Sequence, residues 1–103
     1  MASYLVTGSS RGLGLALVSR LASMPTSEVG IIFATVRKDS TPELKKIANT
    51  SGRVEIVKLD VTDKSSAEEA MRVVESKLQG NGLDYLINNA GVADWSSNGL
   101  EGV

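Results

Sequence analysis

The stretch Thr7-Gly8-Ser9-Ser10-Arg11-Gly12-Leu13-Gly14 directly follows a short apolar segment and precedes a helical pattern. Glycine permits positive φ angles and lets the backbone approach a ligand closely. The free N–H groups at the start of a helix favour an anion such as phosphate. The spacing of the three glycines matches neither G-x-G-x-x-G nor the Walker A sequence. The stretch therefore predicts a turn from strand to helix, either with a bound phosphate or as a tight turn without a ligand.

Strand-like and helix-like patterns alternate along the rest of the chain. We expect strands at Tyr4–Thr7, Ile31–Val36, Val54–Leu59 and Leu83–Asn88, and helices from Gly12 to near Pro25, at Thr41–Thr50 and at Ser65–Gln79. Right-handed crossovers convert this βαβαβαβ order into a parallel sheet with helices on both faces. The predicted fold class is α/β, with a Rossmann-type parallel sheet.

Apolar residues at helical spacing predict which face of each long helix is buried. In the first expected helix these residues are Leu13, Leu17, Leu21 and Met24. In the third they are Ala67, Ala70, Met71, Val74 and Leu78.

The helix starts also have recognisable signals. Thr41 is the expected N-cap of the second helix, with Pro42 in its first turn. The third helix has two candidate capping boxes, Ser65 with Glu68 and Ser66 with Glu69.

Composition narrows the function classes. A length of 103 residues predicts one domain. The chain has no Cys and no His, which excludes a disulfide framework, a thiolate nucleophile and an imidazole base, and it removes the usual zinc ligands. A net charge of −1, spread along the chain, argues against nucleic acid as a partner. The apolar runs are too short to cross a membrane, and without a leader pattern the expected location is the cytoplasm.

Three motifs together resemble a known family. The stretch 7–14 looks like the T-G-x-x-x-G-x-G turn of the short-chain dehydrogenases/reductases. Asn88-Asn89-Ala90-Gly91 is similar to their N-N-A-G motif, and Asp60-Val61 follows the third expected strand as in that family. The resemblance extends from Tyr4 to about Ala93. The sequence Thr35-Val36-Arg37 is closest in character to reductases of fungal secondary metabolism.

The resemblance implies a site for a nicotinamide cofactor. It assigns the pyrophosphate turn to Gly8, Gly12 and Gly14, the lining of this turn to Ser10, Arg11 and Leu13, and the adenine contact to Asp60 and Val61. It places Asn89, Ala90 and Gly91 along the adenosine ribose, with Asn89 also bracing the sheet. Each assignment has an alternative. The asparagines can satisfy backbone groups at a strand end, and Asp60 can be a turn acceptor.

The end of the second expected strand indicates which cofactor is preferred. NAD-specific proteins place an acid there to bind the ribose 2′-hydroxyl. Here Arg37 and Lys38 occupy the position, and an arginine pairs well with a 2′-phosphate. Arg11 would approach the same phosphate from the Gly-rich turn. We therefore expect NADP(H) rather than NAD(H); the alternative is that Arg37 and Lys38 form a solvated loop neutralised by Asp39.

The family's catalytic residues have no counterpart here. Its members use a Tyr with a Lys four residues later, whereas Tyr4 and Tyr85 are followed at that spacing by Gly8 and Asn89. We expect a partial NAD(P)-binding domain at residues 1–93, a polar tail at 94–103, and no turnover by this chain alone. An alternative is a non-catalytic nucleotide-binding or interaction module that docks through the open edge of Leu83–Asn88. A prematurely ended version of a longer protein is also possible.

Overall fold

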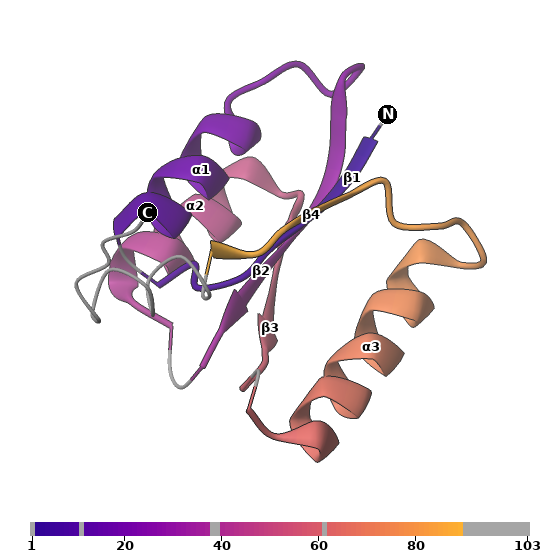
Figure 1. The fold of residues 1–103 in the computed structure, drawn as a ribbon. Coiled ribbons are helices and arrows are strands. Elements are labelled where there is room, and N and C mark those ends of the chain that lie inside the picture. Colours follow the sequence, from indigo (N-terminus) through magenta and orange to yellow (C-terminus); the bar gives the residue numbers. More distant parts are fainter. Residues whose placement is uncertain (1, 11, 38–39, 61, 90–103) are drawn as a thin grey trace, which may run out of the picture.

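Within residues 2–10, 12–37, 40–60 and 62–89, which the computed structural model describes, four parallel strands form one sheet in the order β3-β2-β1-β4 (Figure 1). The elements are β1 (Ala2–Val6), α1 (Gly12–Ala22), β2 (Val29–Val36), α2 (Pro42–Ser51), β3 (Val54–Lys58), α3 (Lys64–Leu78) and β4 (Tyr85–Ile87). The predicted βαβαβαβ order and the Rossmann-type parallel sheet are confirmed.

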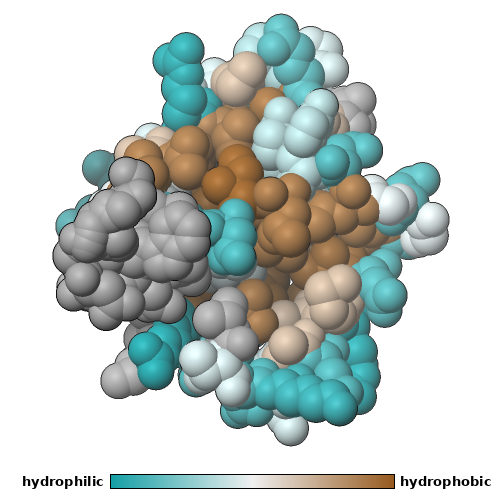
Figure 2. Space-filling model, in the orientation of Figure 1, coloured by the Kyte–Doolittle hydropathy of each residue, from teal (hydrophilic) through white to brown (hydrophobic). Residues whose placement is uncertain are grey.

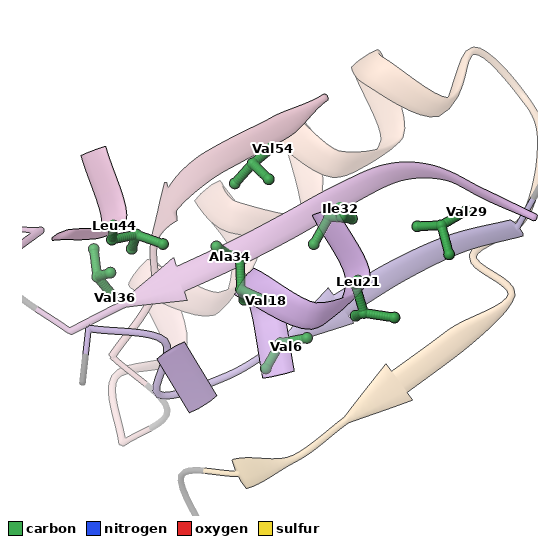
Figure 3. Close-up of a cluster of buried hydrophobic side chains, with 9 residues drawn as sticks. All are labelled: Val6, Val18, Leu21, Val29, Ile32, Ala34, Val36, Leu44 and Val54. Carbon is green, nitrogen blue, oxygen red and sulfur yellow. The ribbon is translucent and has the colours of Figure 1, made fainter. Parts of the chain in front are cut away.

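Helices cover both faces of the sheet, with α1 and α2 on one side and α3 on the other (Figure 1). Successive strand residues point to opposite faces. Val6 and Ala34 therefore belong to the core beneath α1 and α2, whereas Leu5 and Phe33 pack with α3. Figure 3 shows the first of these cores, whose buried members are Val6, Val18, Leu21, Val29, Ile32, Ala34, Val36, Leu44 and Val54.

The strand boundaries lie within two residues of the predicted ones. The strand β4 is shortened at both ends relative to the expected Leu83–Asn88, and it begins only at Tyr85. The carboxylate of Asp84 accepts the backbone N–H of Ser3 at 2.8 Å, and the Ser3 hydroxyl accepts the backbone N–H of Asp84 at 2.9 Å. These side-chain bonds take up backbone donors that a longer ladder would use, so the strand pairing starts only after Asp84.

The helix caps confirm one prediction and correct another. Thr41 is the N-cap of α2, as expected, and its hydroxyl accepts the N–H of Leu44 at 3.3 Å. The capping boxes predicted for α3 were wrong, because its N-cap is Asp63, whose carboxylate accepts the N–H groups of Ser65 and Ser66. The Ser66 hydroxyl instead accepts the backbone N–H of Asp60 at 2.8 Å.

The buried face of α1 is displaced from the predicted apolar stripe, and the buried face of α3 is narrower than the predicted one. In α1 the buried residues are Gly14, Val18 and Leu21, while Leu13 is 61% exposed. In α3 they are Ala70, Val74 and Leu78, while Met71 is 49% exposed. Each helix rests on the sheet through one row of residues, so apolar positions beside that row stay accessible. In the described part of the chain, no helix combines the length and the apolar character that crossing a membrane requires.

Arg53 joins three elements at the end of the sheet opposite the Gly-rich turn. Its guanidinium donates hydrogen bonds to the carbonyls of Ala22, Met24 and Val29. The first two carbonyls lie at and after the end of α1, where backbone acceptors lack helical partners and favour a cation. Arg53 thereby fixes the return of the chain from α1 into β2.

The strand β4 is the least covered part of the sheet. Tyr85 and Leu86 are 54% and 64% exposed, and Figure 2 shows hydrophobic residues gathered at the centre of the face on which β4 lies. The Tyr85 ring stacks on Tyr4, with 4.8 Å between the ring centroids. This stacking covers one side of β4 and leaves Leu86 open on the other.

Candidate functional site

The candidate site lies where the carboxyl ends of the parallel strands meet. From β1 the chain moves outward through β2 to β3 and then returns to place β4 on the other side of β1. In open α/β sheets, ligands bind at the point where the strand order reverses. The Gly-rich turn after β1 and the asparagines after β4 flank that point.

The turn between β1 and α1 is held by the buried residue Ser9. Its hydroxyl donates to the carbonyl of Val6 at 2.7 Å, and its N–H donates to the carbonyl of Thr35 at 3.0 Å. Gly8 and Gly12, on either side, have φ angles of 65° and 62°. Residues other than glycine rarely adopt φ angles in this left-handed region, so the turn depends on glycine at both positions.

Gly14 and Asn89 lie against the same carbonyl, that of Gly8. A Cβ added at Gly14 would lie 2.0 Å from the Gly8 oxygen, so only glycine allows α1 to start this close to the turn. The side-chain amide of Asn89 donates to that oxygen at 3.1 Å, and Asn89 is only 8% exposed. The third glycine therefore serves close packing, and Asn89 joins the end of β4 to the turn after β1.

A second bond joins the same two strand ends. The Thr7 hydroxyl donates to the Asn88 side-chain oxygen at 3.1 Å, and the Thr7 N–H donates to the carbonyl of Ile87 at 3.0 Å. Asn88 itself is exposed, unlike Asn89. The two adjacent asparagines thus have different roles, since Asn89 braces the Gly-rich turn while Asn88 extends the pairing between β1 and β4.

The start of α1 has the features of an anion site. Its first turn contains no acidic residue, and a Cβ at Gly12 would meet no atom within 4 Å. Helix N-termini favour anions through their unpaired N–H groups. Leu13 is exposed beside this space. The Ser10 carbonyl accepts the Thr41 hydroxyl at 2.8 Å, so the turn is also tied to the start of α2.

Arg37 and Asp60 face each other at the ends of β2 and β3. Arg37 Nε lies 3.8 Å from Asp60 Oδ2, with side chains 72% and 31% exposed. Hydrogen bonds to Asp60 Oδ1 from the Thr62 hydroxyl at 2.6 Å and from the Thr62 N–H at 3.0 Å hold the pKa of Asp60 below its usual value, and the charge of Arg37 adds to this. Asp60 is therefore an ionised and fixed carboxylate.

The structure brings most of the predicted residues to one edge. Two groups of predicted residues lie there. One is the ion pair of Arg37 and Asp60, and the other is the Gly-rich turn together with Asn89, which bonds to it: Gly8, Ser10, Gly12, Leu13, Gly14 and Asn89. Four further predicted site residues, Arg11, Val61, Ala90 and Gly91, lie outside the described residues. Lys38 and Asp39, weighed beside Arg37, lie outside them as well.

Three residues at this edge were not predicted as part of the site. Ser9 was passed over within the motif, although a serine between glycines often bonds to nearby backbone groups. Thr41 was recognised only as a helix cap, and its bond to Ser10 depends on tertiary contact. Thr62 stands two residues after Asp60, a spacing typical of an Asx-type turn, and that signal was present in the sequence.

The residues present fit a dinucleotide. The open space over Gly12 at the start of α1 suits a pyrophosphate, and the exposed guanidinium of Arg37 suits a second anionic group farther along the edge. The bonds of Asn89 to the Gly8 carbonyl and of Thr62 to Asp60 are those expected from the alternatives given for these two residues. The roles of these residues toward a cofactor stay predictions.

Comparison with known sequences gives a consistent family match. The profile of the short chain dehydrogenase family matches residues 3–101. The short-chain dehydrogenase/reductase AacuF of Aspergillus aculeatus is 40% identical over 92 residues, which is 89% of this chain and 33% of the relative. An uncharacterized oxidoreductase of Schizosaccharomyces pombe, C663.09c, is 37% identical over 90 residues, covering 86% of this chain and 34% of the relative. The chain spans about a third of the length of these relatives.

Solved structures agree with this match. The NADPH-bound carbonyl reductase from chicken fatty liver superposes with a TM-score of 0.77 at 37% identity, over 85% of this chain and 34% of that one. The carbonyl reductase Sniffer of Drosophila melanogaster gives a TM-score of 0.77 at 30% identity, over 85% and 36%.

Proposed function

Since this chain belongs to the short chain dehydrogenase family, we propose that residues 1–93 form an NAD(P)-binding unit that binds NADP(H). The observation that carries the proposal is the turn itself. Gly8 and Gly12 adopt left-handed φ angles, Asn89 braces the turn from β4, and the space over Gly12 is open. An anion at the start of α1 would meet no acidic side chain in the first turn of the helix.

The preference for NADP(H) is supported by the charge at the end of β2. Arg37 is exposed there, and its only close carboxylate among the described residues is Asp60, at 3.8 Å. An arginine at this position can bind a 2′-phosphate with two parallel hydrogen bonds. The chicken carbonyl reductase that resembles this chain is NADPH-bound, which agrees with the choice.

The proposed activity is that of an oxidoreductase of the carbonyl reductase type. A bound nicotinamide would supply the hydride, and the protein would hold and orient it. Neither tyrosine of the 103 residues is followed four positions later by a lysine. We therefore propose that these residues bind the cofactor without turnover on their own. The polar segment 94–103 is proposed to lie outside the binding unit, and a cytoplasmic location and a role in secondary metabolism stay predictions.

Calorimetric titration of the purified 103-residue chain with NADPH, and then with NADH, tests the proposal. We expect saturable binding with one site per chain and a lower Kd for NADPH. Absence of heat and of any nucleotide-induced rise in melting temperature, in a sample shown to be folded by circular dichroism, would reject it. Equal affinity for both nucleotides would reject only the assigned preference.

A second candidate function is docking of a partner strand on β4. The segment Tyr85–Ile87 has no charged residue, and Leu86 is 64% exposed, whereas the opposite edge strand, β3, carries Glu55 and Lys58. Charged residues discourage pairing at a sheet edge, and their absence permits it. If copies of the chain pair here, sedimentation equilibrium will show a dimer that Leu86→Lys converts to a monomer. A monomer at every concentration in both proteins would reject pairing between copies.

A further inference from the structure

The carboxylate of Asp60 lies beside Arg37, the residue proposed to bind the 2′-phosphate. We propose that Asp60 is a specificity-determining residue that lowers the preference for a 2′-phosphate over a 2′-hydroxyl, so that the chain accepts NADH more readily than Arg37 by itself would allow. This inference rests on the proposed binding of NADP(H). It concerns the balance between the two charges at the ends of β2 and β3.

Asp60 is held in place by its neighbours. Its Oδ1 accepts the Thr62 hydroxyl at 2.6 Å and the Thr62 N–H at 3.0 Å, and its backbone N–H donates to the Ser66 hydroxyl at 2.8 Å. The two bonds from Thr62 keep the pKa of Asp60 below its usual value, so the group is ionised at neutral pH. The negative charge is therefore present at neutral pH and is held at this position by Thr62.

Arg37, in contrast, is held only loosely. The 3.8 Å between its Nε and Asp60 Oδ2 is longer than a hydrogen bond, and its side chain is 72% exposed against 31% for Asp60. Such a contact supplies a charge interaction without fixing the orientation of the guanidinium. Arg37 is free to turn toward a ligand, whereas the carboxylate stays where it is.

The two nucleotides differ only in the group that meets this pair. A 2′-phosphate bound to Arg37 would bring up to two negative charges next to the fixed carboxylate of Asp60, and like charges at short range repel. A 2′-hydroxyl is neutral and does not meet this repulsion. The adenine and the pyrophosphate are common to NADPH and NADH, so any contact of Asp60 with the adenine affects both Kd values alike and cancels in their ratio.

Asp60→Asn isolates the charge. The amide keeps an oxygen that can accept both hydrogen bonds from Thr62, so the local fold is preserved while the negative charge is lost. The matched control is Glu55→Gln, which removes one carboxylate from the other end of β3, where Glu55 lies 3.7 Å from Lys77. Kd values for NADPH and NADH are measured by calorimetry on the full 103-residue chain, at about 20 mM and about 500 mM salt, because surface charge interactions are screened by salt.

We expect Asp60→Asn to increase the ratio of NADPH to NADH affinity by about threefold at low salt, the size typical of an exposed charge interaction. The increase should shrink at high salt, and Glu55→Gln should leave the ratio unchanged. An unchanged ratio in Asp60→Asn overturns the inference, and a lower ratio shows instead that Asp60 positions Arg37. If the wild-type chain binds neither nucleotide, the proposed function fails and this inference fails with it, so the two failures are distinguishable.

Discussion

The side-chain amide of Asn89 donates a 3.1 Å hydrogen bond to the backbone carbonyl of Gly8, from a residue 81 positions away in the sequence. Gly14, in the first turn of α1, packs closely against the same carbonyl. The oxygen is thus enclosed by β4 on one side and by α1 on the other. The shape of the Gly-rich turn depends on both contacts, and each can be tested separately.

Asn89→Ala removes the amide that satisfies the Gly8 carbonyl. Because Asn89 is only 8% exposed, the loss of a buried partner should lower the free energy of unfolding by about 1–3 kcal/mol. Urea denaturation followed by circular dichroism measures this change. Asn81→Ala, at an exposed asparagine, is the control and should change the stability by less than about 0.5 kcal/mol. Equal effects of the two substitutions would show that the Asn89 bond is not stabilising.

Gly14→Ala tests the close approach of α1 to the turn. The added methyl group would lie 2.0 Å from the Gly8 oxygen, so α1 must shift, and the expected loss is about 1–3 kcal/mol or more. Gly82→Ala is the matched control, since a Cβ there meets no atom within 4 Å. It should be neutral or slightly stabilising. Thermal and urea unfolding of both proteins give the comparison, and a stable Gly14→Ala protein would contradict the packing described here.

Gly12→Val is expected to abolish nucleotide binding, because its side chain would occupy the open space over the start of α1 and strain a φ of 62°. The strain alone costs about 1–3 kcal/mol. Gly80→Val shares this strain, with a φ of 90° and no atom within 4 Å, but it lies after α3 and away from the turn. We expect the two variants to lose similar amounts of stability. Calorimetric titration should show loss of nucleotide binding only in Gly12→Val. Unchanged affinity in Gly12→Val would rule out the turn as the pyrophosphate site.

Arg37→Asp is expected to shift the preference toward NADH. An acid at the end of β2 repels a 2′-phosphate and accepts a hydrogen bond from a 2′-hydroxyl. We expect the ratio of NADPH to NADH affinity to fall by at least about tenfold, in line with the loss of a charge-assisted bond to phosphate. Arg72→Asp, at an arginine of similar exposure on α3, reverses the same charge elsewhere and is the control. A ratio that stays fixed in Arg37→Asp would remove Arg37 from the site.

Thr62→Val is expected to raise the pKa of Asp60, because the Thr62 hydroxyl is the main cause of its lowered value. A folded-state pKa below the unfolded value stabilises the fold above the unfolded pKa, and this contribution is lost as the pH falls through the folded pKa. The contribution of Asp60 ionisation to the free energy of unfolding should therefore be smaller in Thr62→Val at neutral pH. Nuclear magnetic resonance titration of the Asp60 carboxyl carbon measures the pKa. Thr26→Val, at an exposed threonine, should not move it.

The element order could be predicted because the signals are local. Alternating periods of apolar residues mark the strands and helices, and Thr41 with Pro42 marks the start of α2. The predicted start of β4 failed because of a contact between distant residues, since Asp84 bonds to Ser3. The predicted caps of α3 failed for a local reason, because the carboxylate of Asp63 accepts the N–H groups of Ser65 and Ser66.

The candidate site divides in the same way. The glycines and Arg37 were recognisable as residue types in a known spacing, and their position at strand ends followed from the parallel sheet. A bracing role for Asn89 was expected from the resemblance, but its partner, the Gly8 carbonyl, was not. The bond from Thr41 to Ser10 was not predicted either, because both contacts require distant segments to meet at one edge. The placement of Asp60 beside Arg37 likewise depends on β2 and β3 being neighbours.

The sequence by itself determined the strand–helix order, the glycines at which the backbone must turn, and a positive charge after β2, because these depend on side-chain types and short spacings. Only the tertiary structure decided that the Gly8 carbonyl is enclosed by Gly14 and Asn89, that Asp60 faces Arg37, and that Leu86 stays exposed. The physical reason is that each of these depends on how distant strand ends and helices pack. The balance of charges at the proposed cofactor site is therefore a property of the fold.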